Sequence, residues 1–517
     1  MGIRKRRFGA VAVALSLLVS ACGGGGTAAP RTGEVDRSAE LRVGINVPAL
    51  PIDPHKGGSD VAQFTYASLV YDRLTKIDPG LELEPMLATS WTFAEDGLSI
   101  DFRLREGVTF SDGAALDAAA VKASLDRAAF DPESTVAHRF VSMESVEVTG
   151  PLAVRIHTKR KAAELPYLLA GTAASIVSPK ALGNADLDVR PVGSGPYELT
   201  ELKLGELAVF QRRDGYWNPE DGRAKTLRLL AMTDDNARLN ALRSGQIDLA
   251  FDHVGMAAKA DALGEGFKTF AYPPGSSFAL FLNGSKPPLD DVKVRQALNY
   301  AIDREAINKS LLGGYCKTNV QPLPEGVPGH LATPPVDYAY DPAKAKALLA
   351  EAGHADGFSI DLLFGSGLSP ESSIATALQA QLAEVGVKVT IDPQDISQIA
   401  ALYTKNGYDS YLQYRLANAT PIVTLSSNYL SPRLYPGKVP AEFAESLEAA
   451  SDPNATEADV TASLEKASAV ANSEAFDLYL CQPPTMMMFS DAVVGADEMG
   501  ASYYTGTFDL RKVGLLG

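Results

Sequence analysis

Residues 85–113 read PMLATSWTFAEDGLSIDFRLREGVTFSDG and carry the clearest structural signal in the chain. Asp96-Gly97 separates two apolar, aromatic-rich segments, which is a strong signal for a β-hairpin. After this turn, apolar and polar residues alternate from Ser99 to Leu104, the period of two that is typical of a half-buried strand. Glu106-Gly107 and Ser111-Asp112-Gly113 are further turn sequences. The stretch therefore predicts a compact antiparallel β unit, whose simplest role is structural.

The same stretch also carries a resemblance to a known family. LATSW and DGLSIDFRLREGVTFSDG resemble the signature region of the family 5 solute-binding proteins of ABC importers, which include peptide-, dipeptide- and nickel-binding proteins. Three further runs resemble this family: VGSGPY (192–197), LRSGQIDLAF (242–251) and DDVKVRQALNYAIDREAI (290–307). The resemblance covers roughly residues 41–517. It implies a class II periplasmic-binding-protein-like α/β fold of two hinged lobes, with an extra small α+β subdomain.

A chain of 517 residues is long enough for two or three domains. The resemblance implies lobe I from residues 41–66, 175–277 and 482–517, a small subdomain from 67–174, and lobe II from 278–481. The residues support an α/β lobe independently, because strand, helix and strand patterns follow one another between Phe358 and Ile391. Such a unit is expected to be right-handed and parallel.

Residues 1–21 have the features of an export signal. Arg4–Arg7 is a positive n-region, and the apolar run Ala10–Val19 is too short to span a membrane as a mature helix. The sequence LVSAC (18–22) resembles a bacterial lipobox, which implies lipidation of Cys22; an ordinary signal peptide is the alternative. Arg6-Arg7 hints at the twin-arginine route, although the general secretory route fits better. Residues 22–40 are rich in Gly, Thr and Ala and predict a flexible tether.

Composition and motifs exclude several classes of function. The chain has 47 Lys and Arg against 63 Asp and Glu, a net charge of −16. No Lys/Arg-rich run lies outside the leader, so nucleic acid is not an expected partner. The six histidines lack metal-ligand spacing, and neither a G-x-S-x-G elbow, a Walker motif nor a marked carboxylate pair is present. We therefore expect no enzymatic activity, no cofactor and no metal site.

Two cysteines remain after the leader, Cys316 and Cys481. An exported compartment permits a disulfide between them. Two free buried thiols are the alternative, because sequence does not show whether the two residues meet.

The resemblance implies ligand-facing residues in three segments. The loop LPIDPHKGGSD (50–60) approaches the ligand in the family, although a Gly-rich loop with a capping Asp is an equal interpretation. The first crossover between lobes begins in PPGSSFALFLN (273–283), and the return crossover is LYLCQPPTMMMF (478–489), whose Met run we interpret as core. These segments nominate Ser59, Asp60, Ser276, Ser277, Phe278 and Gln482. His138 and Arg139 lie in a loop that we expect to be solvated.

The segment YDSYLQYRLANATP (408–421) departs from the family pattern. In peptide-binding members an aromatic residue ends a strand here, and an Asp that pairs with the peptide amine follows shortly. Tyr414 matches the aromatic residue, but the Asp position falls on Ala417 or Asn418. A buried ammonium group without a counter-charge is costly. Arg415 offers a fork for a carboxylate or phosphate, the alternative being a surface strand residue; Tyr414, Arg415 and Asn418 complete the candidate ligand residues.

These observations predict an extracytoplasmic lipoprotein that captures a peptide or peptide-like solute between two lobes and delivers it to an ABC permease driven by an ATPase. The lipid on Cys22 would hold a monomer at the outer face of the cytoplasmic membrane. The alternatives are a binder of an anionic or chelated non-peptide solute, and an exported sensor, hydrolase or chaperone on the same scaffold.

Overall fold

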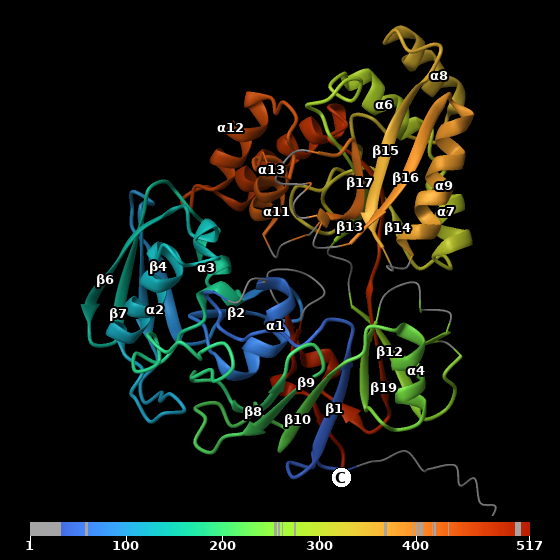
Figure 1. The fold of residues 1–517 in the computed structure, drawn as a ribbon. Helices are drawn as coiled ribbons and strands as arrows, with labels where there is room; N and C mark the ends of the chain where they lie inside the picture. Colours follow the sequence, from blue (N-terminus) through green and yellow to red (C-terminus); the bar gives the residue numbers. More distant parts are fainter. Residues whose placement is uncertain are drawn as a thin grey trace, which may run out of the picture.

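The structure is a computed structural model with two large sheets, one above the other, and a smaller sheet at one side (Figure 1). It describes residues 33–56, 60–252, 256, 259–260, 262–272, 276–366, 370–395, 398–399, 402, 407–415, 417, 420–432, 434–501 and 508–517. Within these ranges, no helix combines the length and the apolar character needed to cross a membrane.

A seven-stranded mixed sheet forms the unit that we call lobe I. Its strand order is β12-β19-β11-β1-β10-β9-β8, with β1 parallel to β10 and β11. The helices α1 (Asp60–Val70) and α4 (Asp235–Arg243) contact its strands. The strands are β1 (Glu40–Ile45), β8 (Tyr197–Lys203), β9 (Leu207–Arg212), β10 (Thr226–Ala231), β11 (Leu249–Asp252), β12 (Phe267–Tyr272) and β19 (Thr485–Ser490).

A six-stranded sheet forms lobe II, in the order β14-β18-β13-β17-β15-β16. Its strands are β13 (Ser277–Leu282), β14 (Lys317–Thr318), β15 (Phe358–Gly365), β16 (Val387–Gln394), β17 (Ser410–Arg415) and β18 (Asp477–Gln482). Its helices are α6 (Val292–Tyr300), α7 (Arg304–Leu311), α8 (Pro342–Glu351), α9 (Glu371–Glu384), α11 (Pro421–Tyr429), α12 (Ala441–Ala450) and α13 (Glu457–Ser473). The predicted parallel unit is confirmed, because β15 and β16 pair in parallel and α9 connects them.

A four-stranded antiparallel sheet, β4-β5-β7-β6, forms the small subdomain. The predicted hairpin is confirmed: β4 pairs with β5, and Gly97 adopts a φ of 71° between them. Residues 108–110 form no strand, only the bridge from Thr109 to Ala115. The elements are β4 (Ala88–Phe93), β5 (Ser99–Leu104), α2 (Ala118–Phe130), η1 (Ala137–Arg139), β6 (Met143–Gly150), β7 (Ala153–Thr158), α3 (Leu165–Leu168) and η2 (Thr172–Ala174).

A further sheet, β22-β21-β2-β3, brings the end of the chain beside the strands that lead into the small subdomain. The remaining elements are β2 (Thr75–Ile77), β3 (Leu83–Pro85), β20 (Val493–Val494), η4 (Ala496–Glu498), β21 (Gly500–Ala501), β22 (Phe508–Asp509), η5 (Leu510–Lys512) and β23 (Gly514–Leu515). Contacts between residues more than 400 positions apart therefore join this subdomain to lobe I.

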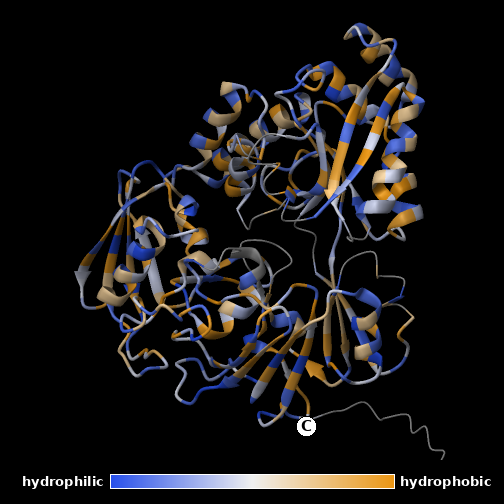
Figure 2. Cartoon of the chain, viewed as in Figure 1, coloured by the Kyte–Doolittle hydropathy of each residue, from blue (hydrophilic) through white to orange (hydrophobic). Residues whose placement is uncertain are grey.

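The hydrophobic cores are built from the apolar residues of the strands. Hydrophobic residues concentrate along the strands of the two large sheets in Figure 2, and Val43, Leu227, Leu280 and Leu362 are completely buried there. Removing such side chains from water is the main favourable contribution to folding. The Met run of β19 is core, as predicted, since Met486–Met488 are at most 3% exposed.

Specific contacts set the ends of two helices. α1 stops at Val70, where the carbonyl oxygen of Val70 accepts a hydrogen bond from Gly195 N at 2.7 Å. A Cβ on Gly195 would lie 2.6 Å from that neighbouring backbone, so only glycine permits this approach. α2 starts at Ala118, where the Asp117 side chain accepts a hydrogen bond from Ala120 N and caps the helix.

The run DDVKVRQALNYAIDREAI (290–307) covers α6 and the start of α7, which are separate helices. Asp303 separates them, because its side chain accepts from Ala306 N at 2.9 Å and caps α7. Asp303 is thus the N-cap of α7. Arg295 of α6 is buried and donates mainly to carbonyl oxygens, including those of Glu474 and Leu289.

Cys316 and Cys481 form a disulfide, which settles the alternative left open by the sequence. Both residues are 2% exposed. The bridge attaches the segment before β14 to β18, the last strand of lobe II before the chain returns to lobe I.

Candidate ligand-binding site

Two chain crossings connect lobe I to lobe II. The first leads from β12 to β13, and the second leads from β18 to β19. β12 pairs with β19 in lobe I, and β13 pairs with β18 in lobe II. The two crossings therefore start and end on paired strands in both lobes. Figure 1 shows them between the two large sheets, on the side away from the small subdomain. Two short adjacent crossings are the usual form of a hinge between domains.

Five of the predicted ligand residues lie at the lobe II end of these crossings. Phe278 packs edge-on against Tyr414, with ring centroids 4.7 Å apart. Ser277 is 2% exposed, and its Oγ accepts a hydrogen bond from Asn319 Nδ2 at 3.3 Å. Gln482 is 3% exposed, and its Nε2 has no hydrogen-bond partner within the described part of the chain. Ser276, just before β13, is partly buried.

Burial raises the pKa of the Tyr414 hydroxyl, mainly by desolvation and secondarily through Glu371. The hydroxyl is therefore protonated at neutral pH and can donate a hydrogen bond.

Several predicted positions fall outside the described residues: Ser59, Asn418 and the lipidation residue Cys22. Asp60 is the first residue of α1, and its side chain is likewise outside the description. An ion pair holds the turn at Asp53, which precedes Ser59 and Asp60 in the chain. Arg127 of α2 donates to both carboxylate oxygens of Asp53, at 2.8 and 2.7 Å.

His55 completes this anchor in the predicted cleft loop. It is fully buried, and its ring nitrogens lie 3.2 Å from Ser175 O and 2.9 Å from Arg127 Nη1. Burial, with a further contribution from the Arg127 charge, lowers the pKa of His55 to about 4. His55 is therefore neutral at pH 7 and fixes the loop that leads to residues 57–60.

Arg415 does not face solvent. Its guanidinium donates to both oxygens of Asp477, at 2.7 and 2.8 Å, and to Leu434 O at 3.0 Å. It also lies 3.5 Å from the ring centroid of Phe281. Both charged side chains are almost fully buried. The carboxylate that the Arg415 fork binds thus belongs to the protein, and this position has a structural role.

A cavity of about 670 Å³ with both apolar and polar lining lies between the small subdomain and α11 of lobe II. On the small-subdomain side it is lined by His138, Arg139, Val141, Ser142, Arg160, Glu164 and Leu168. On the lobe II side it is lined by Val423, Ser426, Ser427, Asn428, Leu430, Ser431 and Leu434. Its volume is in the range of ordinary ligand pockets.

The two walls of this cavity differ in charge. Arg139 and Arg160 bring positive charge from the small subdomain, while serines and Asn428 of α11 bring neutral donors and acceptors. Arg160 Nη2 lies 2.7 Å from Glu164 Oε1, and Glu164 Oε2 is buried without a partner in the described structure. Guanidinium groups are suited to carboxylates, whereas the hydroxyls of Ser426 and Ser427 donate to Val423 O within α11. In the described ranges, no three His, Cys, Asp or Glu side chains are grouped in a way that could hold a metal ion.

Sequence reasoning missed this wall. His138 and Arg139 were expected in a solvated loop, and Arg160 carried no signal at all. The α11 residues gave an ordinary helix pattern opened by Thr420-Pro421. The positive charges became relevant only because the fold places them opposite α11.

Comparisons with known proteins fit this architecture. Residues 82–435 match the family described as bacterial extracellular solute-binding proteins, family 5 Middle. The glutathione-binding protein GsiB of Salmonella paratyphi A is 33% identical over 365 residues, which is 70% of each chain. NikA from Brucella suis, solved in complex with Fe(III)-EDTA, has a TM-score of 0.81 at 27% identity and covers 92% of this chain and 100% of its own.

A third similar protein is DppA from Helicobacter pylori in complex with the peptide STSA. It has a TM-score of 0.81 at 22% identity and covers 93% of this chain and 98% of its own, which shows a shared fold. The family match extends over more than half of the chain, and GsiB matches 70% of it. The chain belongs to the family 5 bacterial extracellular solute-binding proteins.

Proposed function

We propose that this protein is the lipid-anchored receptor of an ABC importer and captures a peptide-like solute with more than one carboxylate between its lobes. The observation that carries this proposal is the cavity between the small subdomain and α11. Arg139 and Arg160 supply positive charge beside Glu164 on one wall, and serines, Asn428 and apolar side chains line the other. A ligand that bridges the two walls binds only when both are in place.

The related proteins support the class of ligand. GsiB is a glutathione-binding protein, and NikA was solved with Fe(III)-EDTA. Glutathione is a small peptide with two carboxylates, and EDTA is a polycarboxylate. Both are anionic at neutral pH, and both suit a wall that carries the positive charges of Arg139 and Arg160.

The segment after β17 supports the same class. Ala417, which is 6% exposed, stands where peptide-binding relatives are expected to place an amine-pairing Asp, with Asn418 as the alternative position. A ligand held chiefly through its carboxylates needs no such Asp. Arg415 is not part of the proposed contacts, because its guanidinium is buried against Asp477 and does not line the cavity. Arg160 also pairs with a carboxylate, that of Glu164, but its side chain is 49% exposed and lines the cavity.

The proposed cycle is hinge closure. Ligand contacts both walls, and its binding energy shifts the population toward the closed form. Ser276, Ser277, Phe278, Tyr414 and Gln482 would form the base of the cleft beside the crossings, and Ser59 and Asp60 would approach from the first loop. The closed monomer would then dock on permease subunits whose ATPase drives uptake. A lipid on Cys22 would hold the receptor at the outer face of the cytoplasmic membrane.

The domain division at residues 67–174 and 278–481 is part of the proposal. It is supported by the strands, since β4–β7 fall in the first range and the lobe II strands fall almost wholly in the second.

A second candidate is a metal ion wrapped by a carboxylate chelator. NikA with Fe(III)-EDTA favours it, and such a complex needs cationic contacts instead of protein ligands to the metal. Binding of the free chelator and of the metal complex distinguishes the two, because a chelate receptor prefers the complex.

Titration calorimetry tests the proposal on the mature chain carrying Cys22→Ala. Glutathione, a dipeptide with one carboxylate and Fe(III)-EDTA are compared. Arg139→Ala and Arg160→Ala should each weaken binding of the preferred ligand about ten-fold or more, since hydrogen bonds to charged groups contribute roughly 1.5–3 kcal/mol. Arg155→Ala is the control, because Arg155 pairs with exposed Asp101 on the same subdomain. Unchanged affinity in both cavity variants would contradict the proposal.

A further inference from the structure

The small subdomain and lobe II meet at a second place beside the cavity, between the loop 451–456 and two turns. Lys161 Nζ lies 2.5 Å from Asp452 Oδ2. Ala163 N donates to Ser451 O at 3.1 Å, and Asn454 Nδ2 donates to Glu95 O at 3.1 Å. The loop connects α12 to α13, so three polar contacts link one connection of lobe II to the small subdomain.

The shapes of these segments also match. Pro453 lies over Gly97 in the β4–β5 turn, where a Cβ on Gly97 would be 3.1 Å from Pro453 Cγ. Gly97 also has a φ of 71°, which glycine adopts without strain. Nearby, Val423 of α11 belongs to the same buried apolar cluster as the core of the small subdomain. The contact therefore combines an ion pair, two hydrogen bonds and close packing.

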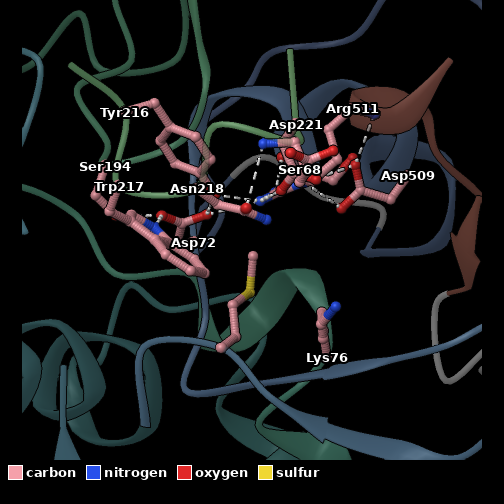
Figure 3. A network of polar contacts seen from close by, with 12 residues as sticks. Ser68, Asp72, Lys76, Ser194, Tyr216, Trp217, Asn218, Asp221, Asp509 and Arg511 are labelled. Atoms are coloured by element: carbon pink, nitrogen blue, oxygen red, sulfur yellow. Dashed lines mark hydrogen bonds and ion pairs between the residues drawn. The ribbon is translucent and has the colours of Figure 1, made fainter. Parts of the chain in front are cut away.

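The small subdomain is fixed to lobe I by a buried polar network, shown in Figure 3. Asp72, which is 0% exposed, accepts hydrogen bonds from Ser194 Oγ, Tyr216 OH, Trp217 Nε1 and Arg511 Nη1. Four donors around one buried carboxylate make a rigid connection, because breaking any of them leaves a buried charge less satisfied.

Other contacts strengthen this connection. Arg105 lies over the ring of Trp217 at 4.2 Å, and Ser111 N donates to Gly193 O at 2.9 Å. Arg213 Nη2 donates to Thr109 O at 2.8 Å. The small subdomain is therefore expected to move with lobe I when the lobes rotate.

Figure 1 places the two crossings on one side of the molecule and the meeting of α3 with α11–α13 on the other. A rotation about the crossings that opens the cleft therefore separates loop 451–456 from the small subdomain. We propose that Lys161, Ala163, Glu95 and Gly97 with Ser451–Asn454 form a latch across the mouth of the cleft, which stabilises the closed form. This inference rests on the hinge closure proposed above, but not on the identity of the ligand.

The latch raises the population of the closed form only modestly. Lys161 and Asp452 are 44% and 29% exposed, and exposed ion pairs contribute little. The hydrogen bond from Lys161, aided by Asn454 N, lowers the pKa of Asp452, so the pair stays ionised at neutral pH. Such a contact separates readily and lets the cleft open for loading and release.

Single-molecule fluorescence transfer on the ligand-free mature chain tests the latch. Dyes on Glu144→Cys and Glu445→Cys, both exposed positions, report the separation of the small subdomain from lobe II. Lys161→Ala or Asp452→Ala should lower the closed-to-open ratio about two- to five-fold, the range expected for a surface pair. Lys161→Asp should lower it further, and Lys161→Asp combined with Asp452→Lys should restore it.

Lys122→Ala is the matched control, because Lys122 pairs with Asp126 inside the small subdomain at similar exposure. Adding Lys161→Cys to Asp452→Cys in an unlabelled chain should trap the closed form on oxidation and slow ligand exchange. Failure of the charge swap to restore closure, or an unchanged ratio in both single variants, would overturn the latch. Because these measurements need no ligand, they stand apart from the calorimetric test, which can fail on its own.

Discussion

Arg511 donates a hydrogen bond to Asp72 at 2.9 Å, although 439 residues separate them in the sequence. Arg511 also pairs with Asp509, and Asp72 receives three further donors. The pair joins the end of the chain to the segment that leads into the small subdomain. It explains why a subdomain inserted near the N-terminus is held by the last residues of the protein.

Asp72→Ala should lower the free energy of unfolding by about 3–5 kcal/mol, since it leaves the buried Arg511 charge short of a partner. Urea unfolding measures this loss. Trp217 donates to Asp72, so its fluorescence should also change; Trp91→Phe removes the only other tryptophan and isolates that signal. An unfolding free energy within 1 kcal/mol of the wild type would contradict a structural role for the network.

Arg415→Ala should destabilise lobe II by about 3–5 kcal/mol, because it strands the buried Asp477 carboxylate. Tyr429 OH also donates to Asp477 at 2.9 Å and would keep only part of the charge satisfied. Thermal and urea unfolding measure the effect. Arg155→Ala, at an exposed pair, should change stability by less than about 1 kcal/mol. If Arg415→Ala lost ligand affinity but kept the stability of the wild type, the structural role would be wrong and Arg415 would be a ligand contact.

The disulfide should stabilise the protein and make its stability sensitive to reductant. Cys316→Ser with Cys481→Ser should lower the free energy of unfolding by about 2–5 kcal/mol, because the bridge restricts the unfolded chain. Urea curves with and without dithiothreitol make the comparison. The wild type should respond to dithiothreitol under unfolding conditions, whereas the double variant should not. Equal curves for wild type and variant without reductant would exclude a stabilising role.

Stability should fall as the pH is lowered from 7 to 5. The pKa of His55 is about 4 in the folded protein and about 6.5 in an unfolded chain. Between pH 7 and pH 5 the unfolded chain binds a proton at His55 that the folded protein does not bind. The free energy of unfolding should therefore be about 2 kcal/mol lower at pH 5 than at pH 7. Urea midpoints at the two pH values measure it. His55→Gln should flatten this dependence, and an equally steep dependence in that variant would assign the effect to other groups.

The fold was predictable where a local pattern is sufficient. The turn Asp96-Gly97 with alternating residues specified the β4–β5 hairpin, and Phe358 to Ile391 specified the parallel unit β15–α9–β16. Element ends were less predictable. α1 ended at Val70 because a distant glycine approaches its carbonyl oxygen, which is a contact that the helix's own residues do not encode.

The candidate site divides in the same way. Phe278, Tyr414 and Gln482 could be nominated because they sit in segments with recognisable patterns, and the structure brings them together beside the crossings. Arg139 and Arg160 could not, because their value depends on α11, which lies over 250 residues further along the chain.

The sequence by itself determined the fold class, the family, the hairpin and parallel units and the expected export signal, because these depend on residue type and local period. The tertiary structure decided what individual polar residues do. Arg415 has the chemistry of an anion receptor, yet Asp477, 62 residues away, occupies its fork. Lys161 looks like any surface lysine until Asp452 lies opposite. Charges act over a few ångströms, so their partners are set by packing between distant segments and not by neighbours in the chain.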